Sequence, residues 1–338
     1  MKHLMTSFTA LTLSATAAAA DVAGYTPLVF DAPHHGRDVL GAVWYPAQDD
    51  GRRFTFAENG VFHGVEVFEE ASVSEGTFPV VLLSHGMGGN IRSLAWLSAA
   101  LAERGAVVVS VNHPNSTWGD FDLKAGMVHG TRAKDLSIAL DVLATDPQFG
   151  DHLDLSRVMA AGFSYGGWTA LSLGGVIGDH AGYIAHCAEH GAASSHCDDL
   201  MSAEIQVGDA DPEVWNASYA DGRVTHVVAI DPGLTWGLGT DAVEGVISDI
   251  TLIGLGDAAD RMLATDYDAS GFARLLPDAT AMTLAPAMHF SALPLCKPMG
   301  AAILAEEGDD PVCTDPEGTD RAAIHAAIIA QLAGDLGL

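Results

Sequence analysis

The feature that most constrains the fold of this chain is a serine between two glycines, at the junction of an apolar run and a helical pattern. The segment VMAAGFSYGG (158–167) is typical of a strand that enters the pattern G-x-S-x-G at 162–166. The glycines let the strand and the following helix approach closely around a tight turn, which lifts the Ser164 hydroxyl above the sheet edge. The helix N-terminus there favours a developing negative charge. We therefore predict that Ser164 is a nucleophile.

Short apolar runs alternate with helical patterns along the chain, which indicates βα units and a mostly parallel sheet. Strands are predicted at 80–84, 106–112, 158–164, 224–230, 250–255 and 281–287. Apolar residues repeat at spacings of three and four in 91–105, 131–146 and 320–336, so each is predicted to be a helix with one apolar face toward the sheet. The segment 30–46 is typical of an antiparallel hairpin, expected at the sheet edge. With 338 residues, 49% of them hydrophobic, the chain suffices for one large α/β domain.

The first twenty residues have the organisation of a secretory signal, with Lys2, an apolar and hydroxyl-rich centre, and three alanines before Asp21. We predict a signal peptide at 1–20 and an α/β domain at 21–338 that is periplasmic or secreted. No later apolar stretch is long enough to cross a bilayer, so no membrane span is expected. The net charge of −29 would repel nucleic acids and anionic membranes, which argues against nucleic-acid partners.

The four cysteines fall into two local pairs, Cys187 with Cys197 and Cys296 with Cys313. In an exported chain such pairs are predicted to be disulfides. The alternative for the first pair is a zinc site that uses nearby side chains. Those side chains are His186, His190, His196 and Asp198. Because their spacing matches no standard zinc template, we expect disulfides and no metal.

A serine nucleophile needs donors for the oxyanion of its intermediate. The segment LLSHGMGGN (82–90) ends an earlier strand in a glycine-rich turn, which can direct backbone N–H groups inward. We assign the donors to the N–H of Met87 and of Tyr165, the residue after the nucleophile. His85 is expected to support this turn.

The base is expected to be His289, which follows the last predicted strand. It lies downstream of Ser164, as the chain order serine, acid, histidine requires. We expect structural roles for His113, for His325 and for the histidines between 186 and 196.

The acid has three candidates, because two strands after the nucleophile each end in carboxylates. VVAIDPGLTWG offers Asp231, and LIGLGDAADRM offers Asp257 and Asp260. Any of them can hold the imidazole tautomer if it faces the second ring nitrogen of His289. We favour Asp260, with Asp231 and Asp257 as alternatives.

Several segments together resemble the predicted dienelactone-hydrolase-like serine esterases, which are related to platelet-activating-factor acetylhydrolase and to polyester-degrading cutinase-like enzymes. The matching segments are GRDVLGAVWYPA, FPVVLLSHGMGG, VVVSVNHPNST, AAGFSYGGWTAL and LLPDATAMTLAPAMHFSALPLC. The resemblance implies an α/β-hydrolase fold, with a mostly parallel central sheet and helices on both faces. It also implies a serine triad with Met87 and Tyr165 as oxyanion donors. True dienelactone hydrolase has a cysteine nucleophile, whereas this chain has Ser164.

The same resemblance bears on the acid. The usual acid lies in a G-x-x-D turn after the penultimate strand, and here that turn, GDAAD, is one residue longer. The spacing to the following YDASGFARLLP favours Asp260 over Asp257. The acetylhydrolase branch would instead select Asp231.

The segment at about 176–222 is longer than the family pattern and is expected to form a lid or rim, with Trp215 or Tyr219 as candidates to line an acyl pocket. We predict a secreted serine esterase that forms an acyl-enzyme on Ser164 and acts on a small-molecule or polymeric ester without a cofactor. The alternatives are an amidase or peptidase with the same triad, and a catalytically silent binding protein of the same fold.

Overall fold

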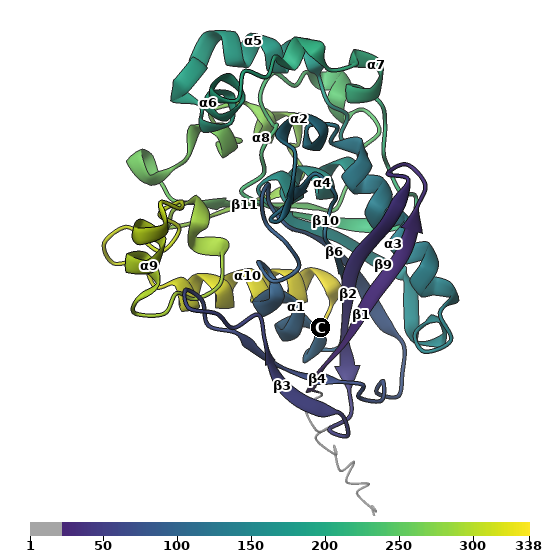
Figure 1. Cartoon of the computed structure of the whole chain (residues 1–338). Helices are drawn as coiled ribbons and strands as arrows, with labels where there is room; N and C mark the ends of the chain where they lie inside the picture. The colour runs from purple at the N-terminus through teal and green to yellow at the C-terminus, as the bar shows by residue number, and fades with distance from the viewer. Residues whose placement is uncertain (1–21) are drawn as a thin grey trace, which may run out of the picture.

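The computed structural model describes residues 22–338, so the predicted signal peptide lies outside the described residues. Its centre is a ten-stranded sheet with the order β12-β11-β10-β9-β5-β6-β2-β1-β4-β3, and β7 pairs with β8 in a separate small hairpin (Figure 1). The strands are β1 (Val22–Ala32), β2 (Arg37–Ala47), β3 (Arg52–Phe56), β4 (Val65–Glu69), β5 (Phe78–Ser84), β6 (Val107–Val111), β7 (Ser116–Thr117), β8 (Asp120–Phe121), β9 (Leu153–Phe163), β10 (Val224–Ile230), β11 (Ile250–Leu255) and β12 (Thr280–Leu284).

The half of the sheet from β12 to β6 is parallel, as the alternation of apolar runs and helical patterns predicts. All five residues of β6 and all six of β11 are buried, which is the pattern of strands covered on both faces. Each predicted strand is present within a few residues. The last one, predicted to reach 287, ends at Leu284, shortly before Pro286, which has no N–H to donate to a sheet.

The predicted hairpin at 30–46 forms, with β1 and β2 antiparallel over their full length. The prediction that this hairpin lies at the sheet edge is wrong. β2 pairs with β6, and β1 pairs with β4, so the hairpin lies inside the sheet. On this side of the sheet the edge strand is β3, which pairs with β4 in antiparallel register.

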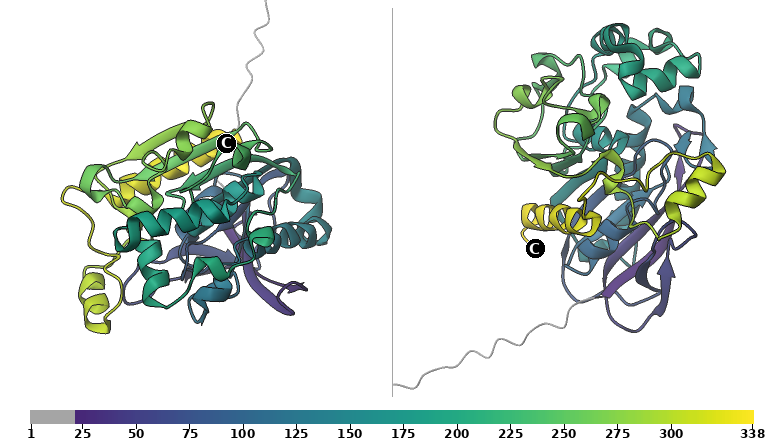
Figure 2. Two further views of the ribbon diagram at one scale, coloured as in Figure 1. Left: turned by 90° about the horizontal axis from the view of Figure 1, so that it is seen from above. Right: turned by 90° about the vertical axis from the view of Figure 1, so that its left-hand side faces the viewer.

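Helices cover both faces of the sheet, as Figure 2 shows in two further orientations. The α-helices are α1 (Ala95–Ala102), α2 (Leu123–Gly126), α3 (Gly130–Thr145), α4 (Tyr165–Leu173), α5 (His180–His190), α6 (Ser195–Ser202), α7 (Pro212–Trp215), α8 (Phe272–Leu275), α9 (Gly300–Glu307) and α10 (Arg321–Leu336). Side chains that alternate along β5 and β6 belong to two separate apolar clusters, one with α3 and α4 and the other with α1 and α10. The helices predicted at 131–146 and 320–336 are α3 and α10, and the one predicted at 91–105 is shortened to α1 because 91–94 form a turn.

The segment at 176–222 carries α5, α6 and α7, which gather at one end of the molecule in Figure 1. Its helices are short, and a disulfide between Cys187 and Cys197 joins α5 to α6. Within residues 22–338, none of the helices combines the length and apolar character that a bilayer crossing requires.

Candidate active site

Ser164 occupies the tight turn between β9 and α4. Its φ of 57° and ψ of −120° lie outside the ordinary regions for a residue with a side chain, and such strain is concentrated at functional sites. A Cβ on Gly162 would overlap the Gly166 carbonyl oxygen, and a Cβ on Gly166 would overlap the Ser84 carbonyl oxygen. The two glycines are therefore required for the close approach of β9, α4 and β5 that presents Ser164.

His289 and Asp231 complete a chain of hydrogen bonds to this serine. The Nε2 atom of His289 lies 3.0 Å from Ser164 Oγ, and its Nδ1 atom lies 2.6 Å from Asp231 Oδ2. All three side chains are buried, although they are separated by 58 and 125 positions in the sequence. Asp231 follows β10, and His289 begins a 3₁₀ helix after β12 (His289–Ala292), so both lie beyond the carboxyl ends of parallel strands.

The Asp231 carboxylate is held by donors on both of its oxygens. Oδ1 accepts hydrogen bonds from the Leu255 backbone N–H, at 2.9 Å, and from Arg261. Oδ2 accepts from the Thr265 hydroxyl, at 2.7 Å, and from His289. Burial raises the pKa of this carboxyl, but the His289 hydrogen bond and the charges of His289 and Arg261 outweigh it and hold the pKa below its ordinary value. The group is therefore an anion that orients the imidazole.

Our expectation that Asp260 faces His289 is wrong, and Asp257 does not face it either. The turn after β11 contains a 3₁₀ helix (Ala258–Asp260), and both Asp257, which precedes it, and Asp260, which ends it, are exposed to solvent. The next residue, Arg261, turns inward instead and pairs with Asp231. Arg261 thus brings a cation to the acid that follows the preceding strand, and the alternative, Asp231, occupies the position next to the imidazole.

The turn after β5 lies directly against Ser164, as the oxyanion assignment requires. A Cβ on Gly86 would lie 3.2 Å from the Ser164 Cβ, so the Gly86-Met87 peptide adjoins the serine. Tyr165 is the first residue of α4, and its backbone N–H has no partner within the helix. The roles of Met87 and Tyr165 as oxyanion donors stay a prediction.

His85 stabilises this turn through a hydrogen bond to its backbone. Its Nδ1 atom lies 2.7 Å from the Gly86 carbonyl oxygen, and its Nε2 atom accepts from the His113 backbone N–H at 3.3 Å. Burial and the neighbouring charge of Arg132 hold the pKa of His85 well below its ordinary value. The neutral ring therefore donates from Nδ1 to the turn and accepts at Nε2.

The other candidate bases have structural contacts. His113 lies between Ser84 and Asp135, with Nε2 and Nδ1 each 2.9 Å from an oxygen. His325 on α10 stacks on Trp96 at a ring separation of 3.7 Å and contacts the carbonyl oxygens of Ser291 and Leu293. It thereby supports the turn that carries His289.

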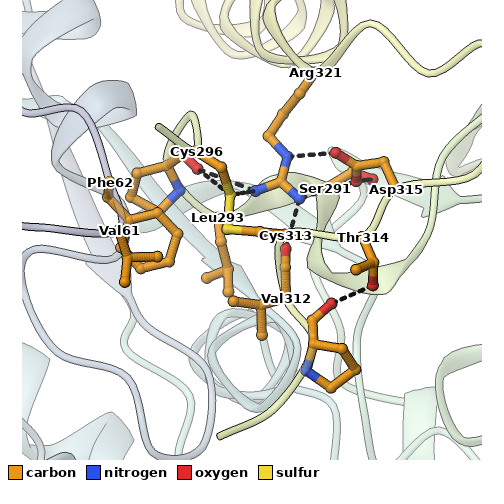
Figure 3. The surroundings of a disulfide bond; sticks show 12 residues. Val61, Phe62, Ser291, Leu293, Cys296, Val312, Cys313, Thr314, Asp315 and Arg321 are labelled. Atoms are coloured by element: carbon orange, nitrogen blue, oxygen red, sulfur yellow. Dashed lines mark hydrogen bonds and ion pairs between the residues drawn. A yellow bond between two sulfur atoms is a disulfide. The ribbon is translucent and has the colours of Figure 1, made fainter. Parts of the chain in front are cut away.

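Both predicted disulfides are present, and the second one lies in the loop that follows His289. Figure 3 shows Cys296 and Cys313 beside Arg321, whose guanidinium donates to the carbonyl oxygens of Pro294 and Val312 and to Asp315. Asp315 in turn accepts a 2.7 Å hydrogen bond from Ser291, which is two residues after His289. The disulfide and this network hold one end of the loop that follows His289.

We expect removal of this disulfide in the double variant Cys296→Ala/Cys313→Ala to lower the free energy of unfolding by about 2–4 kcal/mol, because the bond closes a loop in the unfolded chain. Urea unfolding of the variant and the wild type measures the difference. Cys187→Ala/Cys197→Ala is the matched control for a disulfide that does not adjoin His289. Because only the first variant loosens the His289 loop, we expect kcat to fall further in it than in the control. Equal kcat in the two variants would contradict this coupling.

The segment 176–222 brings a histidine, His196, to the site. The sequence analysis expected only a structural role for this residue. His196 on α6 lies against Gly233, whose N–H donates to the Ser164 carbonyl oxygen. Burial, followed by the charge of His289, lowers the pKa of His196 to about 4, so it faces the site as a neutral ring. Its neighbour Cys197 is in the disulfide that joins α6 to α5. The alternative zinc cluster around this cysteine pair does not assemble among the described residues.

Of the two aromatic residues considered for an acyl pocket, Trp215 lines a cavity of about 500 Å³ between the insertion and the segment around α2. Tyr219 packs against Gly130 and His129 instead. The residues that line this cavity do not include Ser164 or His289. Trp215 thus lines a cavity that does not contain the reactive atoms of the site.

An aromatic hairpin, β7–β8, lies beside the oxyanion turn. The Gly88 N–H donates to the Ser116 carbonyl oxygen at 2.9 Å, and the Trp118 N–H donates to the Gly89 carbonyl oxygen at 3.0 Å. The Trp118 side chain is 75% exposed, and that of Phe121 is 54% exposed. Two large, exposed aromatic residues thus lie on a hairpin that is hydrogen-bonded to the Gly88-Gly89 turn, and the sequence analysis did not identify them.

The sheet order, the turn at Ser164 and the buried Ser164–His289–Asp231 contacts are those of the α/β-hydrolase fold. Across 95% of the chain and 91% of the other, the structure is similar to a ferulic acid esterase from Streptomyces cinnamoneus, with a TM-score of 0.59 and 19% sequence identity. That similarity shows an α/β-hydrolase fold. No family model matches the sequence.

Curated relatives are similar to part of the chain. Cutinase est1 of Thermobifida alba is 32% identical over 99 residues, which are 29% of this chain and 30% of the relative. Bis(hydroxyethyl) terephthalate hydrolase of Streptomyces coelicolor is 31% identical over 110 residues, or 32% of this chain and 33% of the relative. The match thus spans about a third of the length of these relatives, which are all ester hydrolases by name. The expected relation to platelet-activating-factor acetylhydrolase stays an expectation.

Proposed function

We propose that this chain is an exported serine hydrolase that cleaves carboxylic esters through an acyl-enzyme on Ser164. The observation that carries the proposal is the continuous hydrogen-bonded contact from Ser164 Oγ through both nitrogens of His289 to the buried Asp231. A serine in such contact with an oriented imidazole is an activated nucleophile.

In the first half of the proposed reaction, Ser164 Oγ attacks the ester carbonyl while His289 Nε2 takes its proton. The oxyanion accepts hydrogen bonds from the backbone N–H groups of Met87 and Tyr165, next to the positive end of the α4 dipole. His289 then gives its proton to the leaving alcohol. Asp231 stays ionised and stabilises the imidazolium. In the second half, water attacks the acyl-enzyme by the same proton path and releases the acid.

We propose that the preferred substrates are esters of aromatic acids. The names of two relatives, a terephthalate ester hydrolase and a ferulic acid esterase, point in this direction. On this chain, Trp118 and Phe121 offer exposed rings beside the oxyanion turn, on which a flat aromatic acyl group can stack. Export is supported by the two disulfides, which form in oxidising compartments.

The proposal is tested by steady-state kinetics on a panel that pairs p-nitrophenyl butyrate, methyl ferulate and bis(hydroxyethyl) terephthalate with the corresponding amides. We expect turnover of the esters, with the highest kcat/KM on the aromatic ones, and much slower turnover of the amides. Faster amide cleavage would favour the amidase alternative. Lack of turnover across the panel, together with measurable binding of the acids, would favour the catalytically silent binding protein.

Replacement of Trp118 by alanine is expected to raise KM for methyl ferulate about tenfold, because stacking on one aromatic ring contributes roughly 1 kcal/mol or somewhat more. The side chain is exposed, so we expect no loss of stability. Trp118→Phe is the matched control and should retain most of the affinity. An equal rise in KM for p-nitrophenyl butyrate and methyl ferulate would refute the proposed aromatic preference.

A further inference from the structure

Away from Ser164, two adjacent histidines and a buried aspartate converge at the tip of the β1–β2 hairpin. His34 Nε2 lies 2.8 Å and His35 Nε2 lies 3.0 Å from the same atom, Asp135 Oδ1. The three potential ligand atoms all lie within 4.8 Å of one another. The histidines come from the hairpin turn and the aspartate from α3, a hundred positions later in the chain.

This arrangement has the chemistry of a zinc site. Two imidazole nitrogens and one carboxylate oxygen are a common set of three protein ligands for Zn²⁺, with a water at the fourth position. The observed separations are a few tenths of an ångström shorter than the ~3.4 Å between ligand atoms of a tetrahedral zinc ion. The side chains of His34 and His35 are 15% and 5% exposed and that of Asp135 is buried, so the three ligands are largely shielded from bulk solvent.

The Asp135 carboxylate also has a hydrogen-bond partner of the kind that orients a metal ligand from the outer sphere. Its second oxygen, Oδ2, lies 2.9 Å from His113 Nδ1, which fixes the carboxylate and leaves Oδ1 directed at the two histidines. Arg132 on the same helix brings a positive charge near the group. Its guanidinium, however, donates to Ser84, Ser116 and Thr169 and to the His85 carbonyl oxygen, and it makes no hydrogen bond to Asp135.

The histidine pair is held in a fixed turn. The N–H of His35 and that of Gly36 both donate to the Ala32 carbonyl oxygen, at 2.9 and 3.1 Å. Gly36 adopts a φ of 66°, which closes the turn before β2. The two rings lie side by side, with centroids 4.2 Å apart. Both Nε2 atoms are therefore directed at one point before any ion arrives.

We propose that His34, His35 and Asp135 form a binding site for Zn²⁺ that links the β1–β2 turn to α3. Without the ion, each imidazole donates a hydrogen bond from its Nε2–H group to Asp135 Oδ1. On binding, each neutral ring carries its proton on Nδ1 and offers the Nε2 lone pair to the metal, so no net proton is lost. The ion stabilises the folded chain by binding it in preference to the unfolded one. This site does not depend on the proposed esterase activity.

The test is isothermal titration of the chelator-treated, dialysed protein with Zn²⁺, on the wild type, on His34→Gln and on His35→Gln. Glutamine keeps an N–H donor for Asp135 but removes the imidazole ligand, so a merely hydrogen-bonded cluster survives the change. His63→Gln, at an exposed histidine, is the matched control. We expect the wild type and the control to bind one equivalent of Zn²⁺ tightly. In His34→Gln and His35→Gln the Zn²⁺ affinity should fall by more than the about 10–100-fold that loss of an outer-sphere partner costs.

Two further readouts separate this site from adventitious binding. Co²⁺ in place of Zn²⁺ should give the visible absorption of a four-coordinate ion in the wild type and His63→Gln alone. Mg²⁺ and Ca²⁺, which prefer oxygen ligands, should not displace the bound ion. Equal Zn²⁺ affinity in the wild type, His34→Gln and His35→Gln would overturn the proposal, as would absence of a tight equivalent in the wild type.

Discussion

Ser164→Ala is expected to lower kcat for ester hydrolysis by about 10⁴-fold or more, the order of loss seen when a triad nucleophile is removed. The reason is that the attacking atom itself is lost, while the oxyanion donors and the substrate contacts remain. The measurement is kcat on p-nitrophenyl butyrate and methyl ferulate with wild-type and variant protein. The change removes one hydroxyl whose hydrogen-bond partner is His289, so the fold is expected to be retained.

Ser172→Ala is the matched control for this variant. Ser172 lies on the same helix, α4, and its buried hydroxyl has no hydrogen-bond partner within residues 22–338. Loss of such a hydroxyl should leave kcat unchanged and stability equal or slightly higher. If Ser164→Ala retained activity within about tenfold of wild type, the hydrolysis would have to use another nucleophile.

The parallel half of the sheet could be predicted because its strands are short apolar runs separated by helices of clear periodicity. The position of Ser164 could be predicted for a stronger reason. Gly162 and Gly166 lie where any Cβ would overlap backbone atoms, so the sequence pattern records a steric requirement of the turn itself. His289 could be placed because the chain order of the triad leaves one strand end for it.

The antiparallel edge could not be predicted in the same way. β3 and β4 are half-exposed and five residues long, and polar and charged residues alternate with the apolar ones, so their sequences differ little from loops. The small hairpin that presents Trp118 has only two residues in each strand. Its position depends on backbone hydrogen bonds to the Gly88-Gly89 turn, which leave no pattern in the sequence.

The acid was assigned to the wrong strand end for an identifiable reason. Asp231 and Asp260 follow the carboxyl ends of two neighbouring strands, β10 and β11. Periodicity and chain order therefore allow either residue as the acid. What separates them is the direction of one turn: Asp260 faces solvent, and Arg261 faces inward to pair with Asp231. A cation beside the acid is a tertiary feature, and the family spacing that favoured Asp260 takes no account of it.

Asp231→Asn is expected to lower kcat by about 10⁴-fold, as the loss of the orienting carboxylate does in the serine-protease template. An amide has one oxygen where the carboxylate has two. The Leu255 N–H and the Arg261 guanidinium both donate at the Oδ1 position, so the amide oxygen should settle there. The amide NH₂ then occupies the Oδ2 position and donates to His289 Nδ1. That places the imidazole proton on Nε2, and Nε2 can no longer take the proton of Ser164.

Asp260→Asn and Asp257→Asn are the matched controls, since both carboxylates are exposed and neither contacts His289. We expect kcat within about twofold of wild type in both, and circular dichroism with thermal unfolding to show that all three variants fold. An active Asp231→Asn enzyme beside an inactive Asp260→Asn enzyme would mean that the turn after β11 rearranges when substrate binds. The Asp231 contact would then describe only the free enzyme. Because the amide leaves the nearly buried Arg261 guanidinium without this anionic partner, we also expect Asp231→Asn to lose stability, and thermal unfolding separates that loss from the loss of kcat.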